Sequence, residues 1–97
     1  MSRLIWRDKA LKDIQRLYHF IAIENQTAAA RAVKAIQASI QILKTHPHAG
    51  RPAEEIGGGY RQWTVLYGNS GYIVLYNIKP NEVIIHAVRH QKEVGYL

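Results

Sequence analysis

Three apolar runs, separated by two short turn segments, lie in the second half of this chain and restrict the folds that it can adopt. The runs are Tyr60–Tyr67, Tyr72–Ile78 and Glu82–His90, and each is rich in branched aliphatic and aromatic residues. The spacers, Gly68–Gly71 and Lys79–Asn81, contain the glycine, asparagine, serine and proline that are typical of turns. This pattern predicts a three-stranded antiparallel meander.

Two amphipathic helices are predicted upstream of the meander. Between residues 9 and 25, and again between residues 27 and 44, apolar side chains recur every three or four positions. Asp8 and Thr27 stand where the N-caps of these helices are expected. The first apolar stripe comprises Leu11, Ile14, Leu17, Tyr18 and Ile21, and the second comprises Ala29, Val33, Ile36, Ile40 and Leu43. Because their connection is so short, the helices must form an antiparallel hairpin, which then covers one face of the sheet.

The short apolar run Arg3–Trp6 completes the predicted order of elements. It is bounded by charge and suits a small strand at the edge or flank of the sheet. The order is then β-α-α-β-β-β, an α+β fold in which a helical hairpin packs on one face of an antiparallel meander sheet. With 97 residues and no internal repeat, residues 1–97 are predicted to form a single domain.

An excess of basic side chains favours a polyanionic partner. Thirteen lysines and arginines stand against seven acidic residues, which gives a net charge of +6. Nucleic acid, a ribosome or a very acidic protein would complement this charge. The basic residues of the two helices are interpreted as a solvated surface; they are Lys12, Arg16, Arg31, Lys34 and Lys44.

Membrane association, a cofactor and a metal site are not expected. No segment approaches the roughly 18 uninterrupted apolar residues of a membrane span, and the N-terminus lacks the apolar run of a signal peptide. This pattern and the absence of cysteine predict a cytoplasmic protein. Gly57–Gly59 are not followed by the Gly-Lys-Ser/Thr of a phosphate loop. The pairs His46 with His48 and His86 with His90 lack a third ligand at a familiar spacing.

Charged and titratable side chains gather at the two ends of the predicted meander. Arg61 stands near the start of the first strand, and Arg89 and His90 end the last strand. Strict alternation would place His86 and His90 on one face and Arg89 on the other, together with Ile85. His86 is interpreted as a hydrogen-bonded sheet histidine. Because the first and third strands run parallel, Arg61 is expected level with the start of the third strand, and whether the two arginines share a site stays open.

The second face of the sheet has no predicted cover within the chain. The central strand is apolar on both faces, since successive residues alternate, but the hairpin covers only one face. Aromatic residues favour a docking surface for a partner over a plain mixed surface on the second face. The aromatic residues of the meander are Tyr60, Trp63, Tyr67, Tyr72 and Tyr76.

In this order of elements the chain resembles the RelE/ParE superfamily of bacterial type II toxins. The resemblance covers nearly the whole chain; its motifs are Ala10, Asp13-Ile14, Pro47, Gly50-Arg51-Pro52, Gly59-Tyr60-Arg61, Tyr72–Tyr76 and Val83–His90. It implies a small α+β toxin that is neutralised by a cognate antitoxin encoded beside it. An extended or helical antitoxin tail would cover apolar surface that the toxin alone cannot hide.

The ParE-like branch of the superfamily, which poisons DNA gyrase without a known hydrolytic site, is favoured. The Gly50-Arg51-Pro52 loop and the Val88-Arg89-His90 ending resemble this branch. The carboxylates of Glu54-Glu55 would repel a phosphate backbone in the loop where RelE-like toxins carry lysines. In this case Arg61, together with Arg89 and His90, is the expected contact with gyrase.

Two other activities stay open. RelE-like toxins cleave mRNA on the ribosome, a reaction that requires phosphate neutralisation and proton transfer. Arg61 and Arg89 would then neutralise the phosphate, and His90 or Tyr96 would move a proton. The remaining alternative is a degenerate toxin that only binds its antitoxin.

Overall fold

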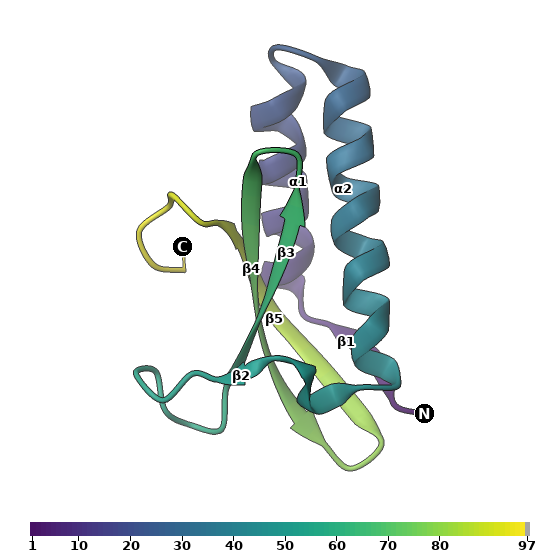
Figure 1. Ribbon diagram of the computed structural model, residues 1–97, viewed down its shortest axis with the longest axis vertical. Helices are drawn as coiled ribbons and strands as arrows, with labels where there is room; N and C mark the ends of the chain where they lie inside the picture. The colour runs from purple at the N-terminus through teal and green to yellow at the C-terminus, as the bar shows by residue number, and fades with distance from the viewer. Residues whose placement is uncertain (97) are drawn as a thin grey trace.

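The computed structural model describes residues 1–96 and shows two helices packed on one face of a twisted sheet (Figure 1). The elements are β1 (Arg3–Trp6), α1 (Asp8–Ala22), α2 (Gln26–Gln41), β2 (Arg51–Pro52), β3 (Arg61–Tyr67), β4 (Ser70–Lys79) and β5 (Glu82–His90), with short 3₁₀ helices at Ile42–Lys44 and Pro47–Ala49. The strand order is β1-β5-β4-β3-β2, in which β1 is parallel to β5 and the other neighbours are antiparallel. The predicted α+β fold and meander are confirmed, and β2 is an additional strand.

The residues that cap the helices differ from the predicted ones. Asp8 is the first helical residue, and Arg7 before it makes no side-chain capping bond. Asp8 therefore acts through its charge near the positive N-terminus of α1. The Oδ1 atom of Asn25 caps α2 by accepting a hydrogen bond of 2.9 Å from the Ala28 amide. Both predicted caps, Asp8 and Thr27, are wrong, because the extended backbone of an N-cap occurs one or two residues earlier.

The hydrophobic core lies between the helices and the sheet. Its largest fully buried side chains are Tyr76, Ile36, Ile40, Leu43, Ile85, Val74, Val83 and Val88. Leu11, which was placed in the apolar stripe of α1, is instead 49% exposed, and Ala10 and Asp13 occupy the buried face. Within residues 1–96, neither helix has the length and apolar character that a bilayer crossing requires.

A β-bulge in β5 sets which side chains face the helices. Leu75 of β4 pairs with Ala87. The next β4 residue, Tyr76, pairs with Ile85, so His86 is an extra residue between the two pairs. A bulge of this kind shifts the alternation of the strand by one residue, so the strand segments on its two sides follow opposite phases.

The bulge corrects the predicted distribution of side chains between the two faces. Ile85 is fully buried in the core and does not share a face with Arg89. His86 turns away from the helices, where its Nε2 atom lies 2.7 Å from Oδ1 of Asn77. His90 stays on the helix side, so the two histidines do not share a face either.

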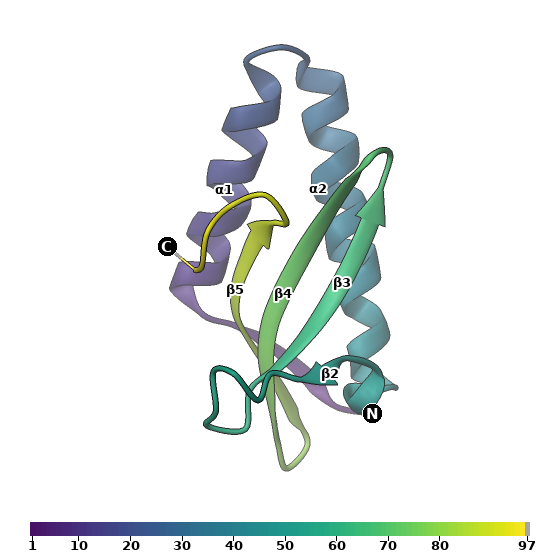
Figure 2. The same cartoon turned by 60° about the vertical axis from the view of Figure 1, so that its left-hand side comes forward.

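The side of the sheet turned away from the helices, here called the open face, carries the residues that alternate with the core side chains. They include Gln62, Thr64, Leu66, Ile73, Leu75, Asn77, Ile84, His86, Ala87 and Arg89. The C-terminal tail, Gln91–Tyr96, turns back after β5 and lies against part of this face (Figure 2). The expectation that the chain offers no cover for it is wrong there, whereas Thr64 and Leu66 remain exposed. Leu75 and Ala87 are only 8% and 1% exposed.

Candidate functional site

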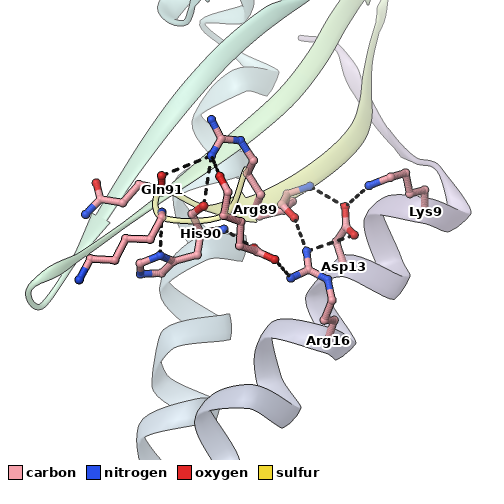
Figure 3. A network of polar contacts seen from close by, with 9 residues as sticks. Lys9, Asp13, Arg16, Arg89, His90 and Gln91 are labelled. Atoms are coloured by element: carbon pink, nitrogen blue, oxygen red, sulfur yellow. Dashed lines mark hydrogen bonds and ion pairs between the residues drawn. The ribbon is translucent and has the colours of Figure 1, made fainter. Parts of the chain in front are cut away.

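Arg89 lies on the open face near the end of β5, where the C-terminal tail encloses it (Figure 3). Its Nη1 atom donates to the backbone carbonyl oxygens of His90, Gln91 and Glu93, at 3.3, 3.4 and 2.7 Å. The guanidinium carbon lies 5.2 Å from the ring centroid of Tyr96, which makes a cation–π contact. The tail therefore fixes the position of this arginine.

Tyr96 bridges the sheet from β5 to β3. Its hydroxyl accepts a hydrogen bond of 2.8 Å from Nε2 of Gln62, so the ring crosses β4 between Gln62 and Arg89. Arg51 of β2 donates to the side-chain oxygen of the same Gln62 and, at 2.9 Å, to Glu55. This side of the sheet thus presents two arginines, and each is engaged by other groups of the chain.

An ion-pair network on the outer edge of β5 holds the start of the tail (Figure 3). Asp13 accepts a hydrogen bond of 2.9 Å from the backbone amide of Val88. Arg16 donates to the carbonyl oxygen of Val88 at 3.2 Å and to the carboxylate of Glu93. Glu93 also accepts a hydrogen bond of 2.8 Å from the amide of His90. Side chains from α1 and the tail therefore satisfy the backbone groups at the end of this strand.

This network exists because β5 extends beyond its neighbour. β1 ends at Trp6, opposite Ile85, so no strand pairs with the outer edge of β5 farther along the described chain. The carboxylate of Asp13 and the guanidinium of Arg16 take the places of the C=O and N–H groups that a longer β1 would offer to Val88. The edge is thereby closed without a strand.

The charges in the network support one another. Asp13 is only 4% exposed and is paired with Lys9 at 2.9 Å and Arg16 at 3.3 Å. Burial lowers the pKa of Arg16, but its bonds to Glu93 and Asp13 outweigh that effect and raise the pKa. Burial also opposes ionisation of Glu93, but the Arg16 bond and the His90 amide lower its pKa. The prediction that Arg16 belongs to a solvated surface is therefore wrong.

His90 lies on the helix side, so the sheet separates it from Arg89. Its ring meets Tyr72 edge-on at 5.3 Å between centroids, and its Nδ1 atom accepts a hydrogen bond of 3.0 Å from the Lys92 amide. Both rings line a largely apolar groove of about 560 Å³, whose wall includes Phe20. Burial is the main cause that raises the pKa of the Tyr72 phenol. His90 therefore faces a different surface from the tail-bound arginine.

Arg61 lies at the opposite end of the sheet. Its Nη2 atom donates to the carbonyl oxygens of His48, at 3.1 Å, and Gly50. The fully buried Tyr76 donates its hydroxyl to the Pro47 carbonyl at 2.7 Å and accepts from the Gly50 amide at 3.0 Å. A Cβ atom on Gly50 would lie 2.6 Å from that hydroxyl, so the loop closes here only on glycine. Arg61 fastens this loop to β3.

Of the four predicted site residues, the structure brings Arg89 and Tyr96 together and separates the other two. Through β4, Arg61 is level with Ile85, well short of the end of β5. It alternates with the open-face residues of β3 and so lies on the helix side, as His90 does. The two arginines that the sequence left unplaced therefore do not share a site.

His86 belongs to a second polar group on the open face. Its Nε2 atom is 2.7 Å from Oδ1 of Asn77, and the ring of Tyr60 meets it edge-on at 5.0 Å. Burial lowers the pKa of His86, and the positive charges of Arg7 and Lys79 add to this effect. The interpretation of His86 as a hydrogen-bonded sheet histidine is confirmed. Within residues 1–96, no three histidine, cysteine or acidic side chains are grouped to hold a metal ion.

Sequence reasoning missed the network of Asp13, Arg16 and Glu93 that orders the tail. One signal was available, because Asp13 shares the buried face of α1 with Ala10 and Leu17. A carboxylate on an apolar helix face needs a partner, so its position indicates a buried hydrogen bond. Lys9 and Arg16, one turn away on α1, are at ion-pair spacing from Asp13. The Val88 amide lies 75 residues away along the chain and could not be named from periodicity.

Comparisons with known proteins agree across nearly the whole chain. The family described as the ParE toxin of the type II toxin-antitoxin system, parDE, matches residues 4–95. Toxin RelE3 of Caulobacter vibrioides is 28% identical over 85 residues, which cover 88% of this chain and 89% of that protein. The solved structure described as the chromosomal ParDE TA system from P. aeruginosa is 26% identical, with a TM-score of 0.76, and the match covers 93% of this chain and 96% of that one.

The helical hairpin on a mostly antiparallel sheet matches the fold of a solved ParDE toxin, which identifies the chain as a small toxin of the RelE/ParE class. The chain belongs to the ParE toxin family of type II toxin-antitoxin systems. The resemblance inferred from the sequence is thus confirmed, and membership of this family implies an antitoxin as the partner protein.

Proposed function

We propose that this toxin inhibits DNA gyrase by binding it, and that the open face around Arg89 and Tyr96 is the contact surface. The observation that carries the proposal is the division of the candidate residues between two faces. A binding surface needs only Arg89, Tyr96 and their neighbours on one face. The match to the ParE family supports the same target. Gyrase acts in the bacterial cytoplasm, so the proposal places the protein there, acting as one domain over residues 1–97.

The four predicted site residues are not arranged for general acid–base chemistry at one phosphodiester. They are Arg61, Arg89, His90 and Tyr96. Cleavage of RNA at the 2′-hydroxyl requires a base, an acid and a phosphate-binding cation around one phosphodiester. His90 lies across the sheet from Arg89, and Arg61 donates to the loop carbonyls of a distant end. In the loop, Glu55 and a glutamine engage Arg51, which reduces its availability to a phosphate.

The contact between Arg89 and Tyr96 favours a second candidate function, ribosome-dependent cleavage of mRNA. It places a cation beside a phenol on one face, and these are two of the groups such a reaction would use. The relative from Caulobacter vibrioides is named Toxin RelE3, after the RelE-like branch of the superfamily. A test of function must therefore include both targets.

The test measures supercoiling of relaxed plasmid by purified gyrase in the presence of the purified toxin. We expect inhibition by the native chain, and a loss of at least about tenfold in potency for Tyr96→Ala, since aromatic side chains are frequent binding hot spots. Tyr18→Ala is the matched control, because Tyr18 lies on α1 and should leave inhibition unchanged.

Undiminished supercoiling at high molar excess of toxin would exclude gyrase as the target. A translation extract analysed by primer extension then decides the alternative, because an endoribonuclease leaves codon-phased cuts. If neither assay responds and induced expression does not arrest growth, the chain is a degenerate toxin that only binds its antitoxin.

A further inference from the structure

The outer edge of β3 is an unpaired strand edge above the short strand β2 (Figure 2). β2 pairs only with Gln62 and Arg61. The Tyr60 carbonyl accepts a hydrogen bond of 2.8 Å from the Ala53 amide, so even-numbered residues direct their backbone groups to this side. The N–H and C=O groups of Thr64 and Leu66 therefore point outward. No backbone hydrogen bond within residues 1–96 involves them on that edge.

This edge carries none of the features by which proteins discourage strand pairing. The segment Trp63–Tyr67 contains no charged residue and no proline, and its pairing with β4 is regular. Leu66 is 78% exposed, and Thr64 is exposed as well. At the far end of the sheet, by contrast, Asp13 and Arg16 close the edge of β5 with charge. The edge of β3 thus lacks the charged closure that the end of β5 has.

The helix beside the edge carries basic and no acidic side chains. α2 lies beside β3, as the 3.0 Å bond from Trp63 Nε1 to Ser39 Oγ shows. Ala35 and Arg31 follow one and two turns away along that side of the helix. α2 contains Arg31 and Lys34 but no acidic residue, and the chain carries a net charge of +6.

From these observations we propose that the β3 edge binds an extended, acidic segment of the antitoxin, which adds a strand to the sheet. A second copy of this chain would bring the same positive charges together, which opposes self-pairing. An acidic segment would complement them while its backbone bonds the outward groups of Thr64 and Leu66. The inference rests on membership of the toxin family, which implies the antitoxin, and not on gyrase as the target.

The added strand would also explain how binding could neutralise the toxin. Leu66 and Thr64 share the open face with Gln62, which contacts Tyr96. A strand paired beside them would extend the sheet next to the tail-covered surface and place its alternate side chains along that face. One segment could thus be held by backbone bonds and obstruct the surface around Arg89.

The test uses the full chain and the protein encoded by the reading frame adjacent to its gene. Hydrogen exchange followed by NMR should show fast exchange at the Thr64 and Leu66 amides of the free toxin and at least tenfold slower exchange in the complex. Thr64→Pro removes the outward N–H, which an edge strand tolerates, and should weaken binding by about tenfold. Thr64→Ala keeps the N–H and should bind within about twofold of the native chain.

Several outcomes would overturn the proposal. Equal exchange of both amides in free and bound toxin would do so, even if Thr64→Pro failed to fold. Protection that appears in the toxin alone and rises with its concentration would identify a second copy as the occupant. Affinity that is unchanged by salt and by Arg31→Gln would exclude an acidic segment. None of these measurements involves supercoiling, so the strand-pairing proposal can succeed or fail independently of the gyrase proposal.

Discussion

The end of β5 and the outer edge of β3 present the same physical problem and solve it differently. Each is a strand edge without a neighbouring strand over part of its length. At Val88, α1 supplies Asp13 and Arg16 as substitutes for a strand. At Thr64 and Leu66, the backbone groups face outward without a partner in the described chain. Both edges belong to one sheet, so their difference reflects local side chains and not the fold.

The difference teaches that edge closure in this protein depends on one helix. α1 runs beside β5 and contributes a carboxylate and a guanidinium at a spacing of one helical turn. α2 runs beside β3 and offers Ser39, which bonds the Trp63 side chain and leaves the backbone edge alone. Substitutions that open the first edge or close the second therefore test this contrast directly.

The largest effect is expected from opening the closed edge with Asp13→Ala. The change leaves the Val88 amide without its partner and Arg16 without one of its carboxylates, so the free energy of unfolding should fall by about 3 kcal/mol. Urea denaturation measures the loss. Lys9→Gln is the control, because Lys9 is 41% exposed and its removal should cost less than about 1 kcal/mol. Equal losses for the two variants would contradict the assigned role of Asp13.

A smaller effect is expected from Glu93→Gln, which weakens the attachment of the tail and should lower the free energy of unfolding by about 1.5 kcal/mol. Because the pKa of Glu93 is lowered in the folded state, its contribution is present above the ordinary value of 4.5 and is lost as pH falls through the folded pKa. Amide exchange in the tail should accelerate, while the β3 edge stays unchanged. Glu82→Gln, in an exposed pair with Arg3, is the matched control.

The free energy of unfolding should depend on pH through His86, the extra residue of the bulge in β5. Its lowered pKa means that the folded state favours neutral imidazole, so stability is full above about 6.5 and declines as pH falls through the folded pKa. His86→Gln should lower the free energy of unfolding by about 1 kcal/mol at neutral pH and flatten the decline below pH 6.5. Thermal unfolding across pH checks this. His48→Gln, at an exposed position, should leave the decline intact.

The smallest change in stability is expected when the uncovered edge receives a charge in Leu66→Lys. Leu66 is 78% exposed, so the free energy of unfolding should stay within about 0.5 kcal/mol. A lysine on the edge should nevertheless reduce further the weak self-association that the exposed backbone groups allow at high concentration, because charge discourages strand pairing. Light scattering measures this, with Leu11→Lys on α1 as a control of equal charge. A similar decrease in both variants would mean that net charge, not the β3 edge, controls association.

The elements of the fold were predictable because their signals are local. Turn residues mark where the strands end, and the range Glu82–His90 is the same in prediction and structure. Both turns are shorter than predicted, because β4 runs from Ser70 to Lys79 and includes residues that were assigned to the turns. The helical stripe at Ile36 and Ile40 likewise marks a buried face. These patterns involve residues that are close in sequence, and hydrophobic periodicity predicts structure only over such short ranges.

The geometry of the site was less predictable because it depends on pairing between distant segments. No residue type marks His86 as a bulge, yet the bulge decides that Ile85 is buried while Arg89 is on the open face. The contact of Tyr96 with Gln62 joins residues 34 positions apart. Such pairings determine which face of the sheet a residue at the end of a strand occupies. For this reason the four predicted site residues lie on two different faces.

The extra residue at His86 also shapes how this strand can change over evolutionary time. Because His86 and Ala87 both lie on the open face, deleting His86 would leave Ile85 in the core and Arg89 on the open face, with simple alternation between them. The gain of a residue within a regular segment of β5 would instead exchange the inside and outside of the residues beyond it. The length of β5 is therefore less constrained at the bulge than in the regular strand on either side of it.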